Sequence, residues 1–177
     1  MTLTDFQVVE ALRAARIPAR YHRPDCSLMK FDAPGAALAK WVQTEAARDL
    51  RAGQGWFVIG NNQQGVDCFF TLARALIVSG MSAKVFSLPL LVRLLGTQEL
   101  SEELEDVSAL FIAGFYEAKH SGACSAAQLH ELEWFFRSRW NNDMAVFPLS
   151  SARIAACDWY SPAFLDALTT FTREVAI

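Results

Sequence analysis

Residues 56–67 read Trp56-Phe57-Val58-Ile59-Gly60-Asn61-Asn62-Gln63-Gln64-Gly65-Val66-Asp67, and an apolar run from Cys68 to Ser79 follows them. The four apolar residues at the start predict a buried strand, and the later run predicts a buried helix. Gly60 and Gly65 bracket a polar turn between the two. The stretch therefore predicts a strand, a tight loop and a helix in direct succession.

The glycines of this loop have the spacing of a phosphate-binding loop, whose pattern is G-x-x-x-x-G-K-[ST]. Val66 stands where the pattern has lysine, and Asp67 stands where it has serine or threonine. The lysine brings positive charge to the phosphates, and the hydroxyl helps to hold Mg²⁺. We therefore expect the frame of a nucleotide-binding protein without its nucleotide chemistry, and we expect no cofactor.

Asp67 is predicted to act against a bound phosphate. A carboxylate at a helix N-terminus can accept the free backbone N–H groups that a phosphate would use, and the helix dipole stabilises it. A carboxylate about 4 Å from a phosphate charge opposes binding by roughly 4 kcal/mol at an effective dielectric constant of 20. We expect Asp67 to occupy the anion site as an internal cap; the alternative is an exposed, ordinary cap. Both disfavour ATP.

Length and composition favour one domain with a substantial core, because 53% of the 177 residues are apolar. No apolar run approaches the roughly 20 residues of a membrane span, and the start of the chain does not resemble a signal peptide. Four cysteines lie far apart, without C-x-x-C spacing: Cys26, Cys68, Cys124 and Cys157. We expect a cytoplasmic protein with reduced thiols and no metal site.

The chain begins with a predicted amphipathic helix. Thr4-Asp5-Phe6-Gln7 forms a capping box, and Ile17-Pro18 ends the helix near Arg16. The helix either packs on the protein's own core or is offered to a groove in a partner. The partner contacts would be Phe6, Val9, Leu12, Arg13 and Arg16.

The segment from Pro18 to Pro34 interleaves basic and aromatic residues. Such a pattern can bind single-stranded DNA, and the candidate contacts are Arg20, Tyr21, Arg23 and Lys30. The alternative is a loop held across the core by its aromatic side chains. The net charge of −3 does not indicate a protein that binds nucleic acid by charge alone.

The rest of the chain alternates short apolar strands with helices, which predicts parallel strands with helices on both faces. Strands are expected near 83–88, 109–113 and 145–148, and helices near 34–50, 90–95, 125–142 and 162–175. Residues 101–106 are expected to be acidic and solvated. The fold class is α/β: a three-layer αβα, P-loop NTPase-like fold with a mostly parallel sheet of four or five strands. Residues 1–34 form an N-terminal helix and lead-in, and residues 35–177 form the main domain.

Trp134 lies off the core stripe of the predicted helix at 125–142. An exposed tryptophan there is a candidate for a partner contact. The alternative is that a neighbouring loop covers its ring.

At this point the residues resemble a family. Ile17-Pro18-Ala19-Arg20-Tyr21 resembles the lead-in of DnaC-like helicase loaders, AAA+ proteins whose relatives include the IstB transposition helpers. Gly60 and Gly65 match the phosphate loop of these proteins. The stretch Asp106–Ile112 resembles the strand that leads into their Walker B acids. The order of elements from Ile17 to about Thr172 is similar to theirs, which implies the same fold.

The chain departs from the family pattern where that pattern carries the chemistry. The two Walker B acids are replaced by Ala113 and Gly114, and the polar sensor matches only Ser150 or Ser151, weakly. Where the family has arginines that face a neighbouring subunit, Ala167 and Phe171 align, and Arg173 alone remains nearby. The resemblance therefore implies a pseudo-ATPase. Another enzymatic activity would rest on the Cys68 thiolate near a helix start, but core packing is the simpler expectation for this residue.

The implied function is that of a catalytically inactive DNA replication protein, from a phage or mobile element, that binds the host's DnaB-like replicative helicase. It would load or recruit the helicase without ATP. One alternative is an inhibitor or decoy that caps or blocks a loader or initiator ATPase. Another is a pseudo-ATPase similar to the transposition helpers. Single-stranded DNA is a possible further partner, and a membrane is not expected.

Overall fold

The computed structural model describes residues 5–60, 62–117 and 124–177. Thr4 of the predicted capping box lies outside these ranges. The helices and strands follow one another in this order: α1 (Asp5–Ala14), α2 (Asp32–Thr44), α3 (Ala46–Arg51), β1 (Gly55–Ile59), α4 (Gln63–Val78), β2 (Ala83–Ser87), α5 (Leu88–Leu94), α6 (Gln98–Leu104), β3 (Ala109–Tyr116), α7 (Ala126–Asn141), β4 (Ala145–Ser150), α8 (Pro162–Phe171) and β5 (Thr172–Ala176).

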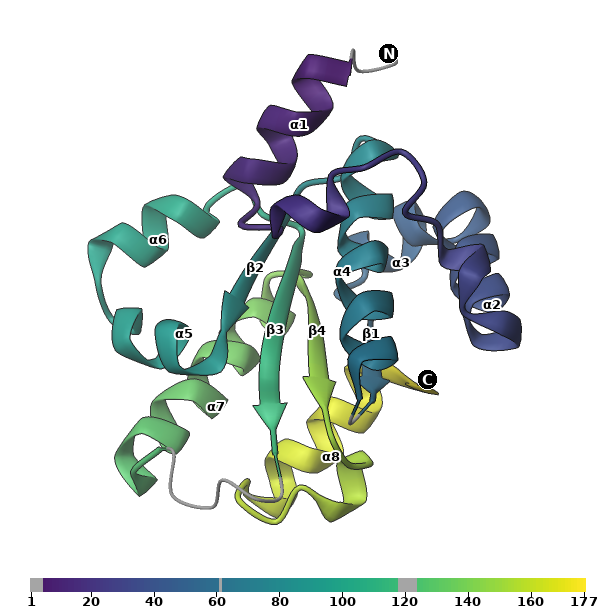
Figure 1. Ribbon diagram of the computed structural model, residues 1–177. Coiled ribbons are helices and arrows are strands. Elements are labelled where there is room, and N and C mark those ends of the chain that lie inside the picture. The colour runs from purple at the N-terminus through teal and green to yellow at the C-terminus, as the bar shows by residue number, and fades with distance from the viewer. Residues whose placement is uncertain (1–4, 61, 118–123) are drawn as a thin grey trace.

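The five strands form one parallel sheet in the order β2-β3-β4-β1-β5 (Figure 1). Helices cover both faces, so the predicted α/β architecture with three layers is confirmed. Among the described residues, no helix combines the length and the apolar character that a bilayer crossing requires.

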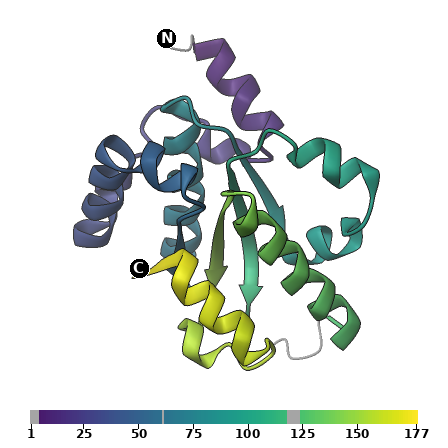
Figure 2. The same cartoon turned by 180° about the vertical axis from the view of Figure 1, so that it is seen from behind.

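The direction of each crossover decides which face its helix covers. From β1 the chain passes over two strands to β2, and it then returns through β3 and β4 to β5. Crossovers between parallel strands are right-handed, so outward and returning crossovers place their helices on opposite faces. Accordingly α4 lies on one face, seen in front in Figure 1, while α7 and α8 lie on the other, seen in front in Figure 2. The N-terminal helices α1, α2 and α3 join α4.

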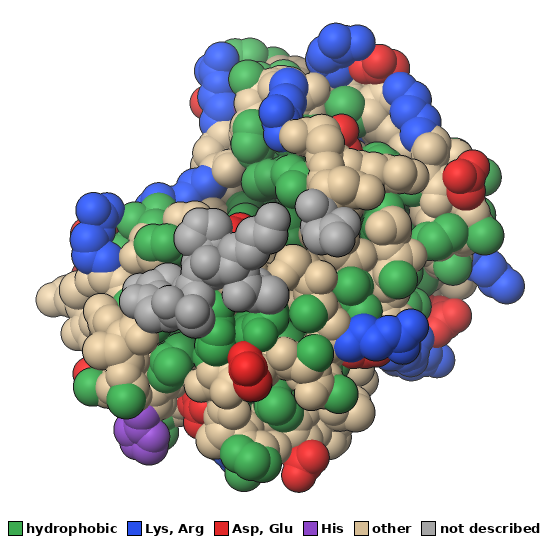
Figure 3. Space-filling view, turned by 60° about the horizontal axis from the view of Figure 1, so that its bottom comes forward, with side chains coloured by type: hydrophobic (Ala, Val, Ile, Leu, Met, Phe, Trp, Pro, Cys, Tyr) green, Lys and Arg blue, Asp and Glu red, His purple; other side chains and the backbone are tan. Residues whose placement is uncertain are grey.

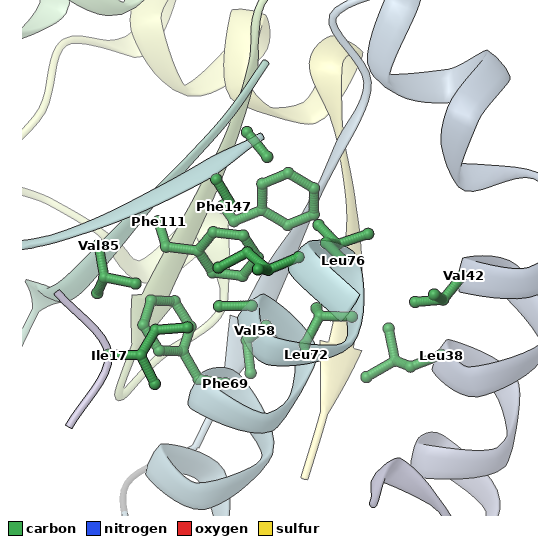
Figure 4. Close-up of a cluster of buried hydrophobic side chains, with 14 of the residues drawn as sticks. Ile17, Leu38, Val42, Val58, Phe69, Leu72, Leu76, Val85, Phe111 and Phe147 are labelled. Atoms are coloured by element: carbon green, nitrogen blue, oxygen red, sulfur yellow. The ribbon is translucent and has the colours of Figure 1, made fainter. Parts of the chain in front are cut away.

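Alternate residues of each strand belong to two separate core clusters, as the two-residue period of a strand requires. Toward α4 point Val58, Phe111 and Phe147, and the last two rings stack with centroids 4.4 Å apart (Figure 4). The other face buries residues such as Phe57 and Leu110 against α5 to α8. The N-terminal segment supplies five buried side chains to the α4 cluster: Leu12, Ala15, Ile17, Tyr21 and Leu28.

Several element boundaries differ from those expected. The predicted helix at 34–50 is two helices, because Glu45 leaves the helical conformation (φ −126°). Residues 98–104 form the helix α6, and its Leu100 and Leu104 are buried. Of the stretch 101–106 that was expected to be solvated, Ser101, Glu102, Glu105 and Asp106 are exposed. The strands β3 and β4 continue to Tyr116 and Ser150, beyond their predicted ends.

The sequence predicts a closing helix over residues 162–175, but the last part of this range belongs to a fifth strand. Helix α8 ends at Phe171, and β5 then pairs with β1 along five residues, from Thr172 opposite Gly55 to Ala176 opposite Ile59. The strand carries β-branched residues, which favour extended structure. Arg173 and Glu174, whose side chains point to opposite faces of the sheet, are both exposed. The segment therefore lacks the continuous apolar run of the inner strands.

Helix α1 is fastened to the body of the protein at its C-terminal end. Arg16 has a left-handed conformation (φ 63°), and the Ile17 N–H donates to the Leu12 carbonyl at 3.0 Å, which is the bond of a Schellman cap. The Ala15 carbonyl accepts from the Val85 N–H at 2.9 Å, so this segment protects part of the outer edge of β2. The C-terminal half of α1 therefore belongs to the core.

Candidate functional site

The candidate site lies at the carboxyl ends of the strands, where β1 and β4 are neighbours. The connection after β1 leaves toward the α4 face, and the connection after β4 leaves toward the α8 face. Open parallel sheets bind ligands at such a switch point. Figure 3 shows this side of the molecule, and in it Lys and Arg side chains lie mostly toward the margins.

The loop after β1 has the tight glycine contact that its sequence predicts. A Cβ atom added to Gly65 would lie 2.6 Å from the Gly60 Cα, so neither residue can be larger without displacing backbone. The Gly60 N–H donates to the Ser150 carbonyl at 2.9 Å, which ties the loop to β4. The strand, loop and helix are confirmed; Asn61 lies outside the described residues.

The N-terminus of α4 is capped by Asn62. Its Oδ1 accepts from the Gly65 N–H at 3.0 Å, and the Val66 N–H makes the first intrahelical bond, to the Asn62 carbonyl at 3.3 Å. The prediction that Asp67 caps this helix is therefore wrong. Asp67 is the fifth residue of α4, more than a full turn past the start of the helix and beyond the N–H groups that lack an intrahelical partner.

Asp67 instead binds the N-terminal lead-in. Its Oδ1 accepts from the Tyr21 hydroxyl at 2.6 Å and from Gln63 Nε2 at 2.6 Å. The guanidinium of Arg20 lies 3.9 Å from the same oxygen. The position that holds a hydroxyl in a working phosphate loop thus carries a carboxylate that is engaged by the protein's own residues.

Val66, at the position of the missing lysine, is half-buried and packs against the core cluster beneath α4. Its side chain brings no charge and no hydrogen-bonding group to the loop. The loop therefore lacks the cation that phosphoryl-transfer proteins place there, and the N–H groups of Gly60, Gly65 and Val66 are already bonded within the protein.

The Walker B positions lie in the second half of β3. Gly114 has a left-handed conformation (φ 70°), and the register with β4 shifts between Ile112 and Tyr116. Ala113 and Gly114 have no side-chain oxygen for Mg²⁺. Across the three described ranges, no group of three or more His, Cys, Asp or Glu residues is placed to hold a metal ion.

The two sensor candidates at the end of β4 have structural partners. The Ser150 hydroxyl donates to the Ala152 carbonyl at 2.7 Å, and the Ser151 hydroxyl donates to the Tyr116 carbonyl at 3.2 Å. Both bonds hold the carboxyl end of the sheet together. Both hydroxyls therefore have a structural role, and these bonds do not indicate a contact with a ligand.

Arg173 is used within the fold. Its Nη2 lies 3.2 Å from Asp49 Oδ2, and its guanidinium sits 5.8 Å from the centre of the Trp56 ring. Asp49 is buried and also accepts from the indole of Trp41 at 2.8 Å. Of the two aligned positions, Phe171 stacks on Trp140 with ring centroids 5.0 Å apart.

Cys68 is a core residue, as the simpler expectation held. Its side chain is fully buried, and burial raises the pKa of the thiol to about 12. A thiol with that pKa is protonated at neutral pH and is a poor nucleophile. The structure gives this residue no catalytic environment.

The partner contacts predicted on α1 divide into two groups. Phe6 is 75% exposed and Val9 is half-buried. Arg13 donates to Glu10 of the same helix at 2.8 Å, but its side chain is 67% exposed, so these three residues are accessible. Leu12 is fully buried, and its assignment as a contact is wrong because it packs in the core. Arg16 is held by Glu103, with bonds of 3.0 and 2.8 Å, and is not free for a partner.

Trp134 on α7 is 68% exposed. The alternative expectation, that a neighbouring loop covers its ring, is therefore wrong. The ring is accessible to a partner.

Of the four candidate contacts for single-stranded DNA, Tyr21 is buried, whereas Arg20, Arg23 and Lys30 are exposed and each forms an ion pair within the protein. Tyr21 is 4% exposed and stacks on Phe70, with centroids 4.9 Å apart, so its ring is not a platform for a base. Arg23 and Lys30 both pair with Asp25, at 2.9 and 3.7 Å. The segment is the strap that the alternative described, and the prediction of a stacking contact by Tyr21 is wrong.

One residue and one contact of the site escaped the sequence-based prediction. Asn62 could have been found, since asparagine directly before a helix is a common N-cap. The pairing of Tyr21 with Asp67 had no comparable signal, because 46 residues separate them and only the fold brings them together.

Comparison with solved structures places this geometry among known proteins. AMPPCP-bound DnaA from Aquifex aeolicus superposes with a TM-score of 0.65 at 12% identity over 88% of this chain. The structure of DnaI superposes at 0.62 with 13% identity, over 93% of this chain and 96% of that one. The chain shares its fold with these two structures. The α/β, P-loop NTPase-like fold predicted from the sequence is thereby confirmed.

A third structure, a protein named as a candidate primosome component from Streptococcus pyogenes serotype M3, gives a TM-score of 0.55 at 14% identity, with 82% of this chain and 80% of that chain covered. The chain spans half the length of the DnaA structure. No protein-family model and no curated protein matches the sequence. At these identities the likeness concerns the fold.

Proposed function

We propose that this protein is an AAA+-like replication factor without ATPase activity, which binds the host's DnaB-like replicative helicase and loads or recruits it independently of ATP. The loader fold supports a role in replication. The absence of phosphate chemistry is supported by the engagement of Asp67 with Tyr21, together with the partly buried Val66 beside it. The contact at Asp67 is the observation that carries the proposal, because it commits the phosphate-loop helix to an internal partner.

The helicase contact is assigned to the accessible stripe of α1. Phe6, Val9 and Arg13 are spaced by three and four residues and therefore share one side of the helix. Phe6 is the most exposed of the large apolar side chains, and the N-terminal half of α1 stands away from the sheet (Figure 1). An aromatic anchor with an arginine nearby is the composition typical of binding hot spots.

Binding of the helicase tests this proposal. We expect the purified helicase to bind the full chain equally well with and without Mg-ATP. Phe6→Ala should weaken binding at least fivefold, about 1 kcal/mol, as loss of a hot-spot residue does. Affinity would be measured by surface plasmon resonance, with thermal melting of each variant recorded.

Trp134→Ala tests the competing candidate for the partner contact, since it removes an aromatic ring of similar exposure from α7. The assignment to α1 is overturned if Trp134→Ala weakens binding and Phe6→Ala does not. The function itself is overturned if the unmodified chain does not bind the helicase. A deletion of residues 1–16 is not a suitable variant, because it would also remove the buried Leu12 and Ala15.

The inhibitor or decoy role is a second candidate, and the state of Arg173 favours it. Arg173 is the one arginine near the positions that face a neighbouring subunit in loaders, and it is held by Asp49 within the fold. A subunit without a free arginine at that surface could end a row of active loader or initiator subunits. Binding of such an ATPase in place of the helicase would identify this role.

A further inference from the structure

One stripe of α4 holds the N-terminal lead-in at several points. Asp67, Phe70 and Arg74 are spaced by three and four residues, so they lie on one side of the helix. Asp67 accepts the Tyr21 hydroxyl, Phe70 stacks on the Tyr21 ring, and Arg74 Nη1 donates to the Cys26 carbonyl at 3.3 Å. The lead-in between Tyr21 and Cys26 is thus fixed along the helix that begins at the phosphate loop.

The lead-in is in turn joined to α1 without a flexible linker. Ile17 is buried, its N–H is bonded to the Leu12 carbonyl, and its own carbonyl lies 2.8 Å from His22 Nε2. Only the short 3-10 turn of residues 19–21 separates Ile17 from the Asp67 contact. A change in the position of Tyr21 would therefore be passed directly to the end of α1.

The geometry points to the Tyr21–Asp67 hydrogen bond as an internal latch that holds α1 in one orientation whether or not nucleotide is present. Position 67 carries the hydroxyl near the metal in a working phosphate loop, and here it carries the acceptor that positions the N-terminal segment. Tyr21 and Asp67 are thus positioning residues for the α1 surface. The consequence for partner binding rests on the proposed function.

The surroundings of the Tyr21–Asp67 hydrogen bond stabilise it. The bond joins a hydroxyl donor to a carboxylate at 2.6 Å, and bonds to charged groups are stronger than neutral ones. Burial, and then the bond to Asp67, raise the pKa of Tyr21 to about 12, so the hydroxyl keeps its proton at neutral pH. Arg20 lies over the Tyr21 ring at 4.8 Å and 3.9 Å from Asp67, and it offsets the carboxylate charge.

Hydrogen–deuterium exchange of the free protein, followed by mass spectrometry, tests the latch. Tyr21→Phe keeps the ring on Phe70 and removes the hydroxyl, and Asp67→Ala removes the acceptor without disfavouring the helix. In both variants we expect exchange of peptides within residues 5–31 to rise about five- to tenfold, the factor expected for one hydrogen bond. Asp67→Ala also removes the contacts with Gln63 and Arg20, but the bond that Tyr21→Phe removes is already absent from it. The double variant should therefore exchange no faster than Asp67→Ala alone.

Two control variants match the chemistry elsewhere in the fold. Tyr116→Phe breaks another tyrosine–aspartate bond, to Asp158 at 2.7 Å, and Asp166→Ala replaces an exposed aspartate at the fifth position of α8. Neither should affect residues 5–31. The latch is disproved if exchange of residues 5–31 is unchanged in both Tyr21→Phe and Asp67→Ala. It is also disproved if, in these two variants, the exchange of β3 peptides rises by the same factor as that of residues 5–31.

Helicase affinity of the same variants separates the latch from the function it serves. Weaker binding by Tyr21→Phe, with Phe6 intact, supports transmission to α1, whereas unchanged binding overturns that consequence. If the unmodified chain does not bind the helicase, the proposed function fails, and the exchange data still decide whether the latch exists.

Discussion

At the scale of single residues, the phosphate loop shows how a site can keep its backbone while its chemistry is replaced. The two glycines still approach each other closely, and the helix still begins directly after the loop. Val66 has joined the core, and Asp67 has become the acceptor for Tyr21. The backbone requirement and the chemical requirement of the motif are therefore separable.

Gly65→Ala tests the backbone requirement. Alanine is favoured over glycine inside a helix by about 1 kcal/mol, so propensity alone predicts a more stable protein. The contact with Gly60 predicts the opposite, a loss of about 2–3 kcal/mol in the free energy of unfolding from overpacking. Urea denaturation decides between the two signs.

Gln64→Ala is the control for this substitution, since the neighbouring side chain is exposed and alanine should cost little there. A gain in stability for Gly65→Ala would show that the two glycines do not approach each other as closely as described.

At the scale of elements, α1 and α6 are joined by an ion cluster around Glu103. Its carboxylate accepts from Arg16 at the end of α1 and from Lys84 of β2 at 3.0 Å. Burial by itself raises the pKa of Glu103, but the bonds from Arg16 and Lys84 outweigh it and hold the pKa below its usual value. The charged form is therefore favoured by folding.

The stability of the protein should accordingly depend on this carboxylate in acid. A lowered pKa in the folded state gives stability that is present above the unfolded pKa of about 4.3 and is lost as the pH falls through the folded pKa. Glu103→Gln should lower the free energy of unfolding by about 1.5–3 kcal/mol at pH 7, and its difference from the unmodified protein should shrink below about pH 4.

Urea denaturation between pH 3 and pH 7 measures this difference, and Glu102→Gln, at an exposed neighbouring position, serves as control. An equal loss of stability for Glu103→Gln at pH 3 and pH 7 would contradict an electrostatic origin.

At the scale of the whole molecule, the departures from the family pattern lie in three separate places. Those after β1 and within β3 lie toward the carboxyl ends of the strands, whereas Arg173 lies toward the amino ends, since it pairs with Trp56 near the start of β1. The lysine, the hydroxyl and the acidic ligands act together in phosphoryl transfer. Restoring one of them would therefore leave the others unfilled.

We therefore expect no binding of Mg-ATP at micromolar affinity. Isothermal titration calorimetry of the full chain measures it, with a nucleotide-binding loader titrated in parallel to show that the conditions support binding. A dissociation constant in the micromolar range would overturn the assignment as a pseudo-ATPase.

Whether a feature could be predicted from the sequence depends on whether the interactions that form it are local or long-range. Buried strands and the helix α4 were found, because apolar periodicity is a local signal. Strand β5 was missed, since its outward residues are charged and its pairing with β1 is long-range. For the same reason the Tyr21–Asp67 bond was not foreseen, and the sequence left open whether Leu12 faces the core or a partner: each depends on which segments the sheet topology brings together.

The position of β1 has a consequence for how the chain is made. This strand lies inside the sheet, yet its two neighbours are β4 and β5, which are among the last segments to leave the ribosome. While β2 and β3 can already pair, the backbone of residues 55–59 has no strand on either side. Unpaired apolar strands in incomplete chains are prone to aggregate. Synthesis that stalls before residue 145 should therefore yield an insoluble fragment rather than a smaller folded unit.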